Sequence, residues 1–328
     1  MKTPKKSSFG ACAPALALAL TAAAAFAQDK PAATFTPGIP GVFSAGTPIE
    51  LVKEGFSGTE GPVALADGSL IFTETPANRI TRIAADGSTS TFLDDSNGSN
   101  GLGFTANGDL YAVQVLQPRV GIVYPASRAR VLADQFEGLP FGRPNDLVVA
   151  KDGTVYFTDS GTQRRPDQPA PANVARPAVY RITPAGALQR LAADIERPNG
   201  VTLSPDEKVL YVANTAGEHV LAFDIAADGT VGPRRNFARL EGLRQTGNGP
   251  SSGADGLAVD ALGRLYVAST AGIQVFDEKG AALGIVPLPK APQNIAFAGT
   301  DKRTLYAVGR GSAWRITALT SGFGGRAK

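Results

Sequence analysis

One pattern recurs six times along the chain, and it restricts the fold more than any other feature. In each copy an oxygen-bearing side chain opens a short apolar run, a turn follows, and a second apolar run contains an aromatic residue. The second runs begin at positions that step by 40, 45, 55, 55 and 40 residues: Leu70, Leu110, Val155, Leu210, Leu265 and Leu305. Repeats of about 40–50 residues built from short strands are typical of a β-propeller.

The first repeat shows how each unit is built. It holds four apolar runs, with Asp-Gly between the first two and between the last two, at residues 62–66, 69–73, 79–83 and 89–93. Asp-Gly between short apolar runs predicts a hairpin, and no stretch shows sustained helical periodicity. We therefore expect an all-β, six-bladed β-propeller over residues 49–320, with four antiparallel strands per blade. A strand near Ile49–Lys53 is expected to pair with the last blade, beside Trp314–Ile316, which removes a free sheet edge.

The two ends of the chain differ in composition from the repeats. Three Lys precede an Ala- and Leu-rich run, and Ala25-Phe26-Ala27 fits a small-x-small cleavage site, so residues 1–27 are predicted to be a secretory signal peptide. Residues 28–48, rich in Pro, Gly, Ala and Thr, are predicted to form an extended linker, and residues 321–328 a C-terminal tail. This organisation predicts a secreted, periplasmic protein with no membrane attachment after cleavage.

Composition excludes several kinds of chemistry. Without the three Lys of the leader, 29 basic residues remain against 29 acidic ones, so charge gives no case for a nucleic-acid partner. The only cysteine, Cys12, lies in the leader, which excludes disulfides and thiolate sites from the mature chain. His219 is the only histidine; we expect it at a strand start or in a surface loop, with no catalytic role. Any metal site must therefore use oxygen ligands.

The six residues that open the apolar runs form the candidate site. Inner propeller strands converge on the central channel, so these residues should lie around one axis: Glu60, Asn100, Asn145, Asn199, Asp255 and Asn294. Two carboxylates with several amide oxygens suit calcium, with magnesium, manganese and zinc as alternatives. Beside such an ion Asp255 stays ionised and is a candidate general base. Taken singly, each Asn or Asp before Gly is also a plain turn former.

Other residues are expected on the same face of the propeller. The connection between the second and third strands of blade three, Gln163 to Pro177, is long and Pro-rich, and either overhangs the site as a lid or is a solvated loop. Glu74 and Asp159 end second strands on this face. We expect them to be solvated strand ends rather than supports of the site.

Several of these segments carry a family resemblance. Glu60-Gly61-Pro62, Arg143-Pro-Asn145-Asp146, Arg197-Pro-Asn199-Gly200 and Ala254-Asp255-Gly256 resemble motifs of the senescence-marker/gluconolactonase/luciferin-regenerating superfamily. The resemblance spans about residues 50–317. It implies a six-bladed propeller with an axial divalent metal, usually calcium, held by Glu60, Asn199 and Asp255. Asn145 would be a further metal ligand or a substrate contact, Asp255 the acid/base residue, and Arg143 a substrate-binding residue. We also expect Asn100 on the substrate side.

Three functions fit these observations. The first is a metal-dependent lactonase acting on a small molecule, in which the ion polarises the lactone carbonyl and activates water. The second is a hydrolase of other esters or of organophosphates at the same site. The third is a non-catalytic propeller that binds a ligand or a protein and keeps the ion for stability. Two carboxylates at the axis favour an enzyme, although the fold alone does not establish one.

Overall fold

The computed structural model describes Met1 and residues 35–162, 172–247 and 249–326 of the 328-residue chain. Apart from Met1, the predicted signal peptide lies outside this part. The described residues are almost entirely strand and turn, with two short 3₁₀ turns at Thr75–Ala77 and Ala126–Arg128. No helix among them is long and apolar enough to cross a membrane. The strands form six four-stranded antiparallel sheets, which are the six blades of the predicted propeller.

The first three blades follow one another along the chain. Blade one contains β2 (Glu60–Ala64), β3 (Leu70–Glu74), β4 (Arg79–Ile83) and β5 (Thr89–Asp94). Blade two contains β6 (Ser99–Phe104), β7 (Leu110–Gln114), β8 (Arg119–Tyr124) and β9 (Arg130–Ala133). Blade three contains β12 (Pro144–Val149), β13 (Val155–Asp159), β14 (Ala178–Ile182) and β15 (Leu188–Ala192).

The last three blades complete the ring. Blade four contains β16 (Pro198–Leu203), β17 (Val209–Asn214), β18 (His219–Ile225) and β19 (Val231–Arg239). Blade five contains β22 (Leu257–Val259), β23 (Leu265–Ser269), β24 (Gly272–Phe276) and β25 (Ala282–Val286). Blade six contains β26 (Asn294–Ala298), β27 (Thr304–Gly309), β28 (Ser312–Thr317) and β1 (Glu50–Glu54). As expected, His219 is the first residue of a strand, β18.

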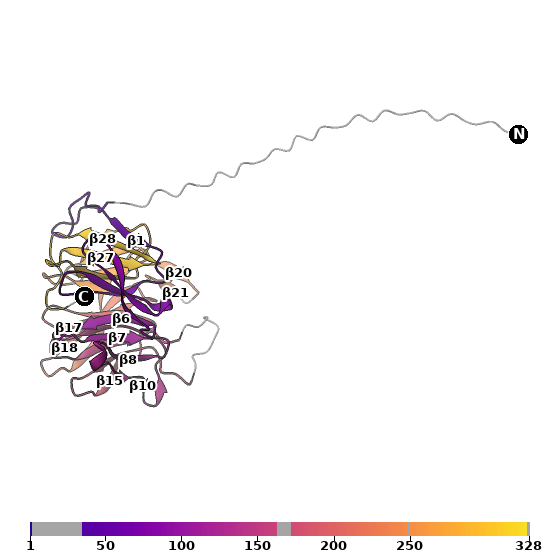
Figure 1. Cartoon of the computed structure of the whole chain (residues 1–328), viewed down its shortest axis with the longest axis vertical. Helices are drawn as coiled ribbons and strands as arrows, with labels where there is room; N and C mark the ends of the chain where they lie inside the picture. Colours follow the sequence, from indigo (N-terminus) through magenta and orange to yellow (C-terminus); the bar gives the residue numbers. More distant parts are fainter. Residues whose placement is uncertain (2–34, 163–171, 248, 327–328) are drawn as a thin grey trace. The chain divides into compact units, whose positions relative to one another are not determined.

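Ring closure is confirmed. The strand β1 is the outermost strand of the last blade and pairs with β28, with Leu51 opposite Trp314 (Figure 1). The inner strands contact one another in the order β2, β6, β12, β16, β22, β26, and β26 returns to β2. Each blade is thus packed between two neighbours, and the apolar core fills the spaces between adjacent sheets.

Turn chemistry sets the hairpins as the sequence predicts. In the first hairpin of blade one the Asp67 carboxylate accepts a hydrogen bond from the backbone N–H of Ser69 at 3.0 Å, and Gly68 has φ +83°. Asp86 and Gly87 repeat this arrangement in the second hairpin. The aspartate satisfies the turn backbone, and glycine takes the left-handed conformation without strain.

The segment before β1 is not an extended linker in its described part. Residues 36–47 form tight turns, in which the N–H of Thr36 donates to the carbonyl of Thr47 at 2.8 Å. The side chains of Ile39, Val42 and Phe43 are at most 2% exposed and join the core cluster between blades five and six. Apolar residues spaced among Pro and Gly allow this turn-rich segment to pack, which composition alone did not indicate.

Candidate active site

Three polar contacts join neighbouring blades at the ends where the inner strands begin. The Nδ2 of Asn294, in blade six, donates to the Glu60 carboxylate of blade one at 3.3 Å, and Gln293 donates to the same carboxylate at 3.1 Å. Between blades two and three, Asn100 Nδ2 donates to the backbone carbonyl of Asn145 at 2.8 Å. The structure therefore places these side chains at one end of the inner-strand ring.

Glycines close the ring where the blades approach most tightly. A Cβ at Gly61 would collide with the backbone of Asn100, and one at Gly200 with the backbone of Asp255. A Cβ at Gly256 would collide with the side chain of Asn294. In these copies of the motif the second residue is glycine because the next blade occupies the space of a side chain. The ring order is thereby fixed from blade one to two, four to five and five to six.

Threonine hydroxyls at the second strands reinforce the same ring. The Thr158 hydroxyl of β13 donates to the carbonyl of Asn199 in the next blade at 2.6 Å. The Thr215 hydroxyl, just after β17, donates to the carbonyl of Ala254 at 2.7 Å, one residue before Asp255. Each bond holds the backbone of a candidate site residue from the preceding blade. Sequence reasoning missed this role.

Asn199 carries the clearest sign of an absent partner. Its side chain is 6% exposed, and its Nδ2 donates to the Thr215 hydroxyl at 2.9 Å. That bond fixes which way the amide faces, and Oδ1 is left buried with no hydrogen-bond donor among the described residues. A buried acceptor without a donor costs about 1–3 kcal/mol, which a cation at this position would offset.

The donor set around Asn199 fits a hard cation. Glu60 and Asp255 are half-buried, and the backbone N–H of Asp255 donates to the carbonyl of Ala268 at 2.9 Å. Within the described ranges no cluster of three or more His, Cys, Asp or Glu side chains occurs. An ion held here would therefore rely on amide oxygens as well as on the two carboxylates, which is typical of calcium.

Asn100 is engaged within the protein rather than exposed toward a ligand. It is 2% exposed, its Oδ1 accepts a hydrogen bond from the Thr75 hydroxyl at 3.1 Å, and its Nδ2 holds the carbonyl of Asn145. These contacts favour a role in positioning Asn145 over the substrate contact expected from the sequence. Asn145 and Arg143 are half-buried at the start of β12.

Asp159 is a support of the site and not a solvated strand end. Its side chain is fully buried at the end of β13, and it accepts hydrogen bonds from the backbone N–H groups of Gly142, Arg143 and Gly161 at 2.7–2.8 Å. Burial raises the pKa of this carboxyl, and the three N–H donors offset part of that effect. The carboxylate fixes the backbone from which Arg143 and Asn145 project.

Glu74 in blade one is likewise not the solvated strand end expected from the sequence. It is fully buried and accepts hydrogen bonds from the backbone of Ser57 at 2.8 Å, from Arg79 at 2.8 Å and from the Thr81 hydroxyl at 2.6 Å. Blades two and four place a polar residue at the same position, where Gln114 donates to the carbonyl of Ser96 and Asn214 accepts from the N–H of Arg197.

The last residue of the second strand thus clamps the loop that enters the same blade's inner strand, in four blades of six. The regular recurrence of a polar residue at that register was visible in the sequence as Glu74, Gln114, Asp159 and Asn214. We call this set the strand-end clamps.

Two small hairpins on the connections into inner strands were not predicted. The strands β10 (Gln135–Phe136) and β11 (Leu139–Pro140) precede β12, and β20 (Arg244–Thr246) and β21 (Gly249–Ser251) precede Asp255. Ser251 Oγ donates to the carbonyl of Thr215 at 2.6 Å, which ties the second hairpin to the ring. In the sequence, the long step of 55 residues from Leu210 to Leu265 was the available indication of the second hairpin.

The predicted lid, Gln163 to Pro177, is described only in part, because residues 163–171 lie outside the described residues.

Comparison with known proteins agrees with this architecture. A family model described as the SMP-30/gluconolactonase/LRE-like region matches residues 58–309. A gluconolactonase of Zymomonas mobilis is 30% identical over 311 residues, covering 88% of this chain and 86% of the relative. A solved gluconolactonase from Xanthomonas campestris has a TM-score of 0.74 and 28% identity, covering 88% of this chain and 95% of that chain.

A solved calcium-binding protein, regucalcin from Agrobacterium tumefaciens, has a TM-score of 0.69 and 18% identity, covering 84% of this chain and 95% of that chain. This likeness shows the fold. The gluconolactonase relatives support a lactonase-like hydrolase that acts on a small molecule.

Proposed function

Because the chain belongs to the SMP-30/gluconolactonase/LRE-like family, we propose that it is a metal-dependent lactonase whose site is the ring of inner-strand residues. The observation that carries the metal dependence is the buried Oδ1 of Asn199, which lacks a donor among the described residues. It lies in a ring that also contains Glu60 and Asp255. An oxygen-lined site of this kind is suited to a divalent cation and poorly suited to an apolar filling.

Four residues would hold the ion: Glu60, Asn145, Asn199 and Asp255. Calcium is the ion that this donor set favours, since it binds carboxylate and amide oxygens together and tolerates irregular geometry. Magnesium, manganese and zinc are the alternatives to be tested. When bound, such an ion polarises a carbonyl oxygen and lowers the pKa of coordinated water.

The chain's own residues supply the remaining steps. Asp255 accepts the proton of the attacking water, and its backbone is fixed for this task by Ala268 at 2.9 Å and by the close packing of Gly200. Arg143 binds the lactone, on a backbone segment held by the buried Asp159. Water adds to the acyl carbon, the acyl C–O bond of the lactone breaks, and the leaving oxygen takes the proton from Asp255, which yields a hydroxy acid and restores the carboxylate.

The test is hydrolysis by the mature chain after removal of metal with a chelator and dialysis. Calcium, magnesium, manganese and zinc are added back separately against sugar lactones, aromatic lactones, simple esters and an organophosphate. We expect one ion to restore lactone hydrolysis. Selective hydrolysis of esters or of the organophosphate would instead support the second function inferred from the sequence.

The variant Asp255→Asn keeps the shape of the side chain and removes its basicity. It should lower kcat by about 10²–10⁴-fold, whereas Asp86→Asn, in an exposed hairpin turn on blade one, should keep wild-type rates. Wild-type turnover in Asp255→Asn would exclude the base role. Ion-dependent thermal stabilisation without hydrolysis of any substrate would support a binding propeller with a structural ion.

We also propose that the protein is exported to the periplasm. The support is the sequence pattern of residues 1–27 alone. Mass spectrometry of protein recovered from a periplasmic extract should show a chain that begins at Gln28. Recovery of the uncleaved chain only from the cytoplasm would contradict this.

A further inference from the structure

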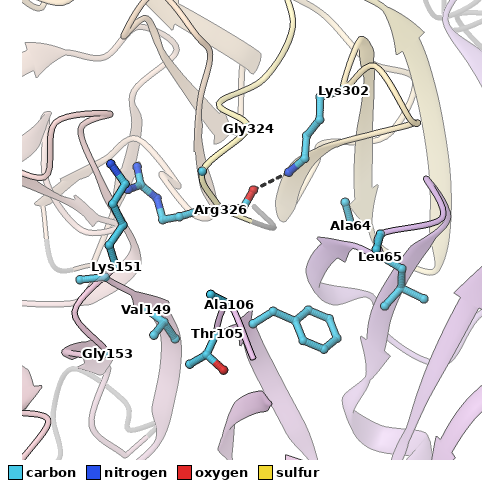
Figure 2. A pocket seen from close by; sticks show the side chains of 14 residues that line it. Ala64, Leu65, Thr105, Ala106, Val149, Lys151, Gly153, Lys302, Gly324 and Arg326 are labelled. Atoms are coloured by element: carbon cyan, nitrogen blue, oxygen red, sulfur yellow. Dashed lines mark hydrogen bonds between the residues drawn. The ribbon is translucent and has the colours of Figure 1, made fainter. Parts of the chain in front are cut away.

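A hollow of about 310 Å³ lies at the other end of the inner strands (Figure 2). Its walls come from the residues where β2, β6 and β12 end and their hairpin turns begin, and from the turn before β27. Since β2 begins at Glu60 and reaches the hollow at Ala64 and Leu65, about 15 Å of strand separates it from the candidate active site. The hollow is therefore a separate feature of the propeller.

The C-terminal segment forms one side of this hollow. The N–H of Gly322 donates to the carbonyl of Lys302 at 2.8 Å, and the N–H of Phe323 donates to Val259 at 3.1 Å. Arg326 then reaches blade four, where it donates to the Glu207 carboxylate at 3.1 Å and to the carbonyl of Ser204 at 3.0 Å. The part of the predicted tail that the structure describes is thus bound to the propeller.

The charge inside the hollow is unbalanced. The Nζ of Lys302 donates to the backbone carbonyl of Arg326, and no ion pair involving Lys302 occurs within the described ranges. The Glu207 carboxylate is paired with Arg326, and Lys151, which also lines the hollow, lies with its Nζ 5.5 Å from the centre of the Phe323 ring. Burial, with the nearby charge of Arg326, lowers the pKa of Lys302 to about 8. A largely desolvated ammonium is unfavourable unless an anion lies close to it.

Another part of the lining is apolar. Leu65 and Phe104 are half-buried and Val149 is buried, and all three line the hollow. Figure 2 shows Lys302 reaching toward Arg326 in the upper part of the view, Leu65 at the right and Val149 at the lower left. A volume near 310 Å³ falls at the lower end of the range found for small-molecule sites, about 300–1,000 Å³.

We propose that this hollow binds a small organic anion, with its carboxylate or phosphate head at Lys302 and its apolar body against Leu65, Phe104 and Val149. The anion places a negative charge beside Lys302, for which the described residues provide no ion pair, and the apolar wall removes the body of the ligand from water. Neither contribution requires the metal ion or the carboxylates of the candidate active site.

The experiment is calorimetric titration of the metal-free mature chain with benzoate, as an anion with an apolar body, and with inorganic phosphate as a head group alone. Wild-type protein should bind benzoate saturably, and more tightly than phosphate. Lys302→Met retains most of the aliphatic stem and removes the charge, so benzoate affinity should fall at least tenfold. Lys279→Met, at an exposed turn in blade five, should bind as the wild type does.

Two further measurements make the result decisive. Thermal unfolding without ligand checks that Lys302→Met is folded, since the substitution removes a poorly solvated charge and its hydrogen bond to the carbonyl of Arg326. Asp255→Asn should bind benzoate with unchanged affinity, which separates the hollow from the active site. Absence of saturable benzoate binding, equal binding by Lys302→Met, or equal affinity for phosphate and benzoate would each overturn the proposal.

Discussion

At the residue scale, the close packing of the inner strands depends on glycines, which have no Cβ. Gly61, Gly101, Gly200 and Gly256 follow the oxygen-bearing residues of four blades, and each lies against the next blade where a Cβ would collide with it. In the sequence these glycines indicate a turn, which is why the tight approach between blades could not be inferred. Predicting it requires knowing which residue of the next blade faces each glycine, and the spacing of the repeats does not give this.

Substitution of Gly200 tests this packing. A Cβ there would meet the backbone carbonyl of Asp255, which has no flexible end that can move aside. We expect Gly200→Ala to lower the free energy of unfolding by about 1–3 kcal/mol and to reduce lactonase activity by displacing Asp255. Gly232→Ala is the matched control, since its Cβ would meet only an ordinary contact at 3.5 Å. Denaturant unfolding of both variants gives the comparison, and equal stabilities would contradict this account.

At the scale of the element, the strand-end clamps explain how a hairpin positions a loop. In blade one Glu74, at the end of β3, binds the backbone of Ser57, which leads into β2 and Glu60. The sequence places Glu74 and Asp159 correctly on this face, yet it suggests solvated strand ends, because charged residues at strand ends are usually exposed. Only the tertiary fold brings backbone donors to these carboxylates, so their burial could not be foreseen.

The blade-one clamp predicts a pH dependence. Burial alone would raise the pKa of Glu74, but hydrogen bonds from Arg79, Thr81 and Ser57 outweigh it and lower the pKa below its ordinary value of 4.5. Because its pKa is lower in the folded state, ionised Glu74 stabilises the protein at pH values above about 4.5. This stabilisation is lost as the pH falls through the pKa of Glu74 in the folded state. Glu74→Gln should therefore be less stable than wild type by about 1–3 kcal/mol at pH 7.

In acid the difference in the free energy of unfolding between wild type and Glu74→Gln should become smaller, because protonation of Glu74 removes the same charge from the wild type. Urea unfolding of both proteins at pH 7, 5 and 3.5 measures it. A difference in the free energy of unfolding that stays constant from pH 7 to 3.5 would show that the charge of Glu74 does not contribute to stability.

At the scale of the whole molecule, the six-fold repetition made the architecture predictable. Blade number, hairpin positions and the pairing of β1 with β28 follow from the spacing of apolar runs and turns, and the structure confirms them. The site roles of Glu60, Asn145, Asn199, Asp255 and Arg143 remain predictions. The hairpins β10–β11 and β20–β21 did not follow, because each is an irregular insertion into the repeat. The packed segment before β1 did not follow, because it lies outside the repeats.

The segment before β1 gives the prediction at this scale. A chain that begins at residue 49 lacks the buried side chains of Ile39, Val42 and Phe43, each worth about 1.5–3 kcal/mol when buried. We expect it to melt well below a chain that begins at residue 35, although both retain β1. Equal melting temperatures, measured by calorimetry, would mean that these residues cover the core without stabilising it.

Closure of the ring by β1 also determines the order in which parts of the propeller can assemble during synthesis. Glu50 pairs with Arg315 across 265 positions of sequence, so the first propeller strand to be synthesised is the last to find its partner. Until β26 has been made, the inner strand of blade one lacks its neighbour from blade six. Five blades can assemble during synthesis, but the site shared by all six comes into existence only once the end of the chain is available. A chain interrupted late in translation would thus be mostly folded and still have no complete site.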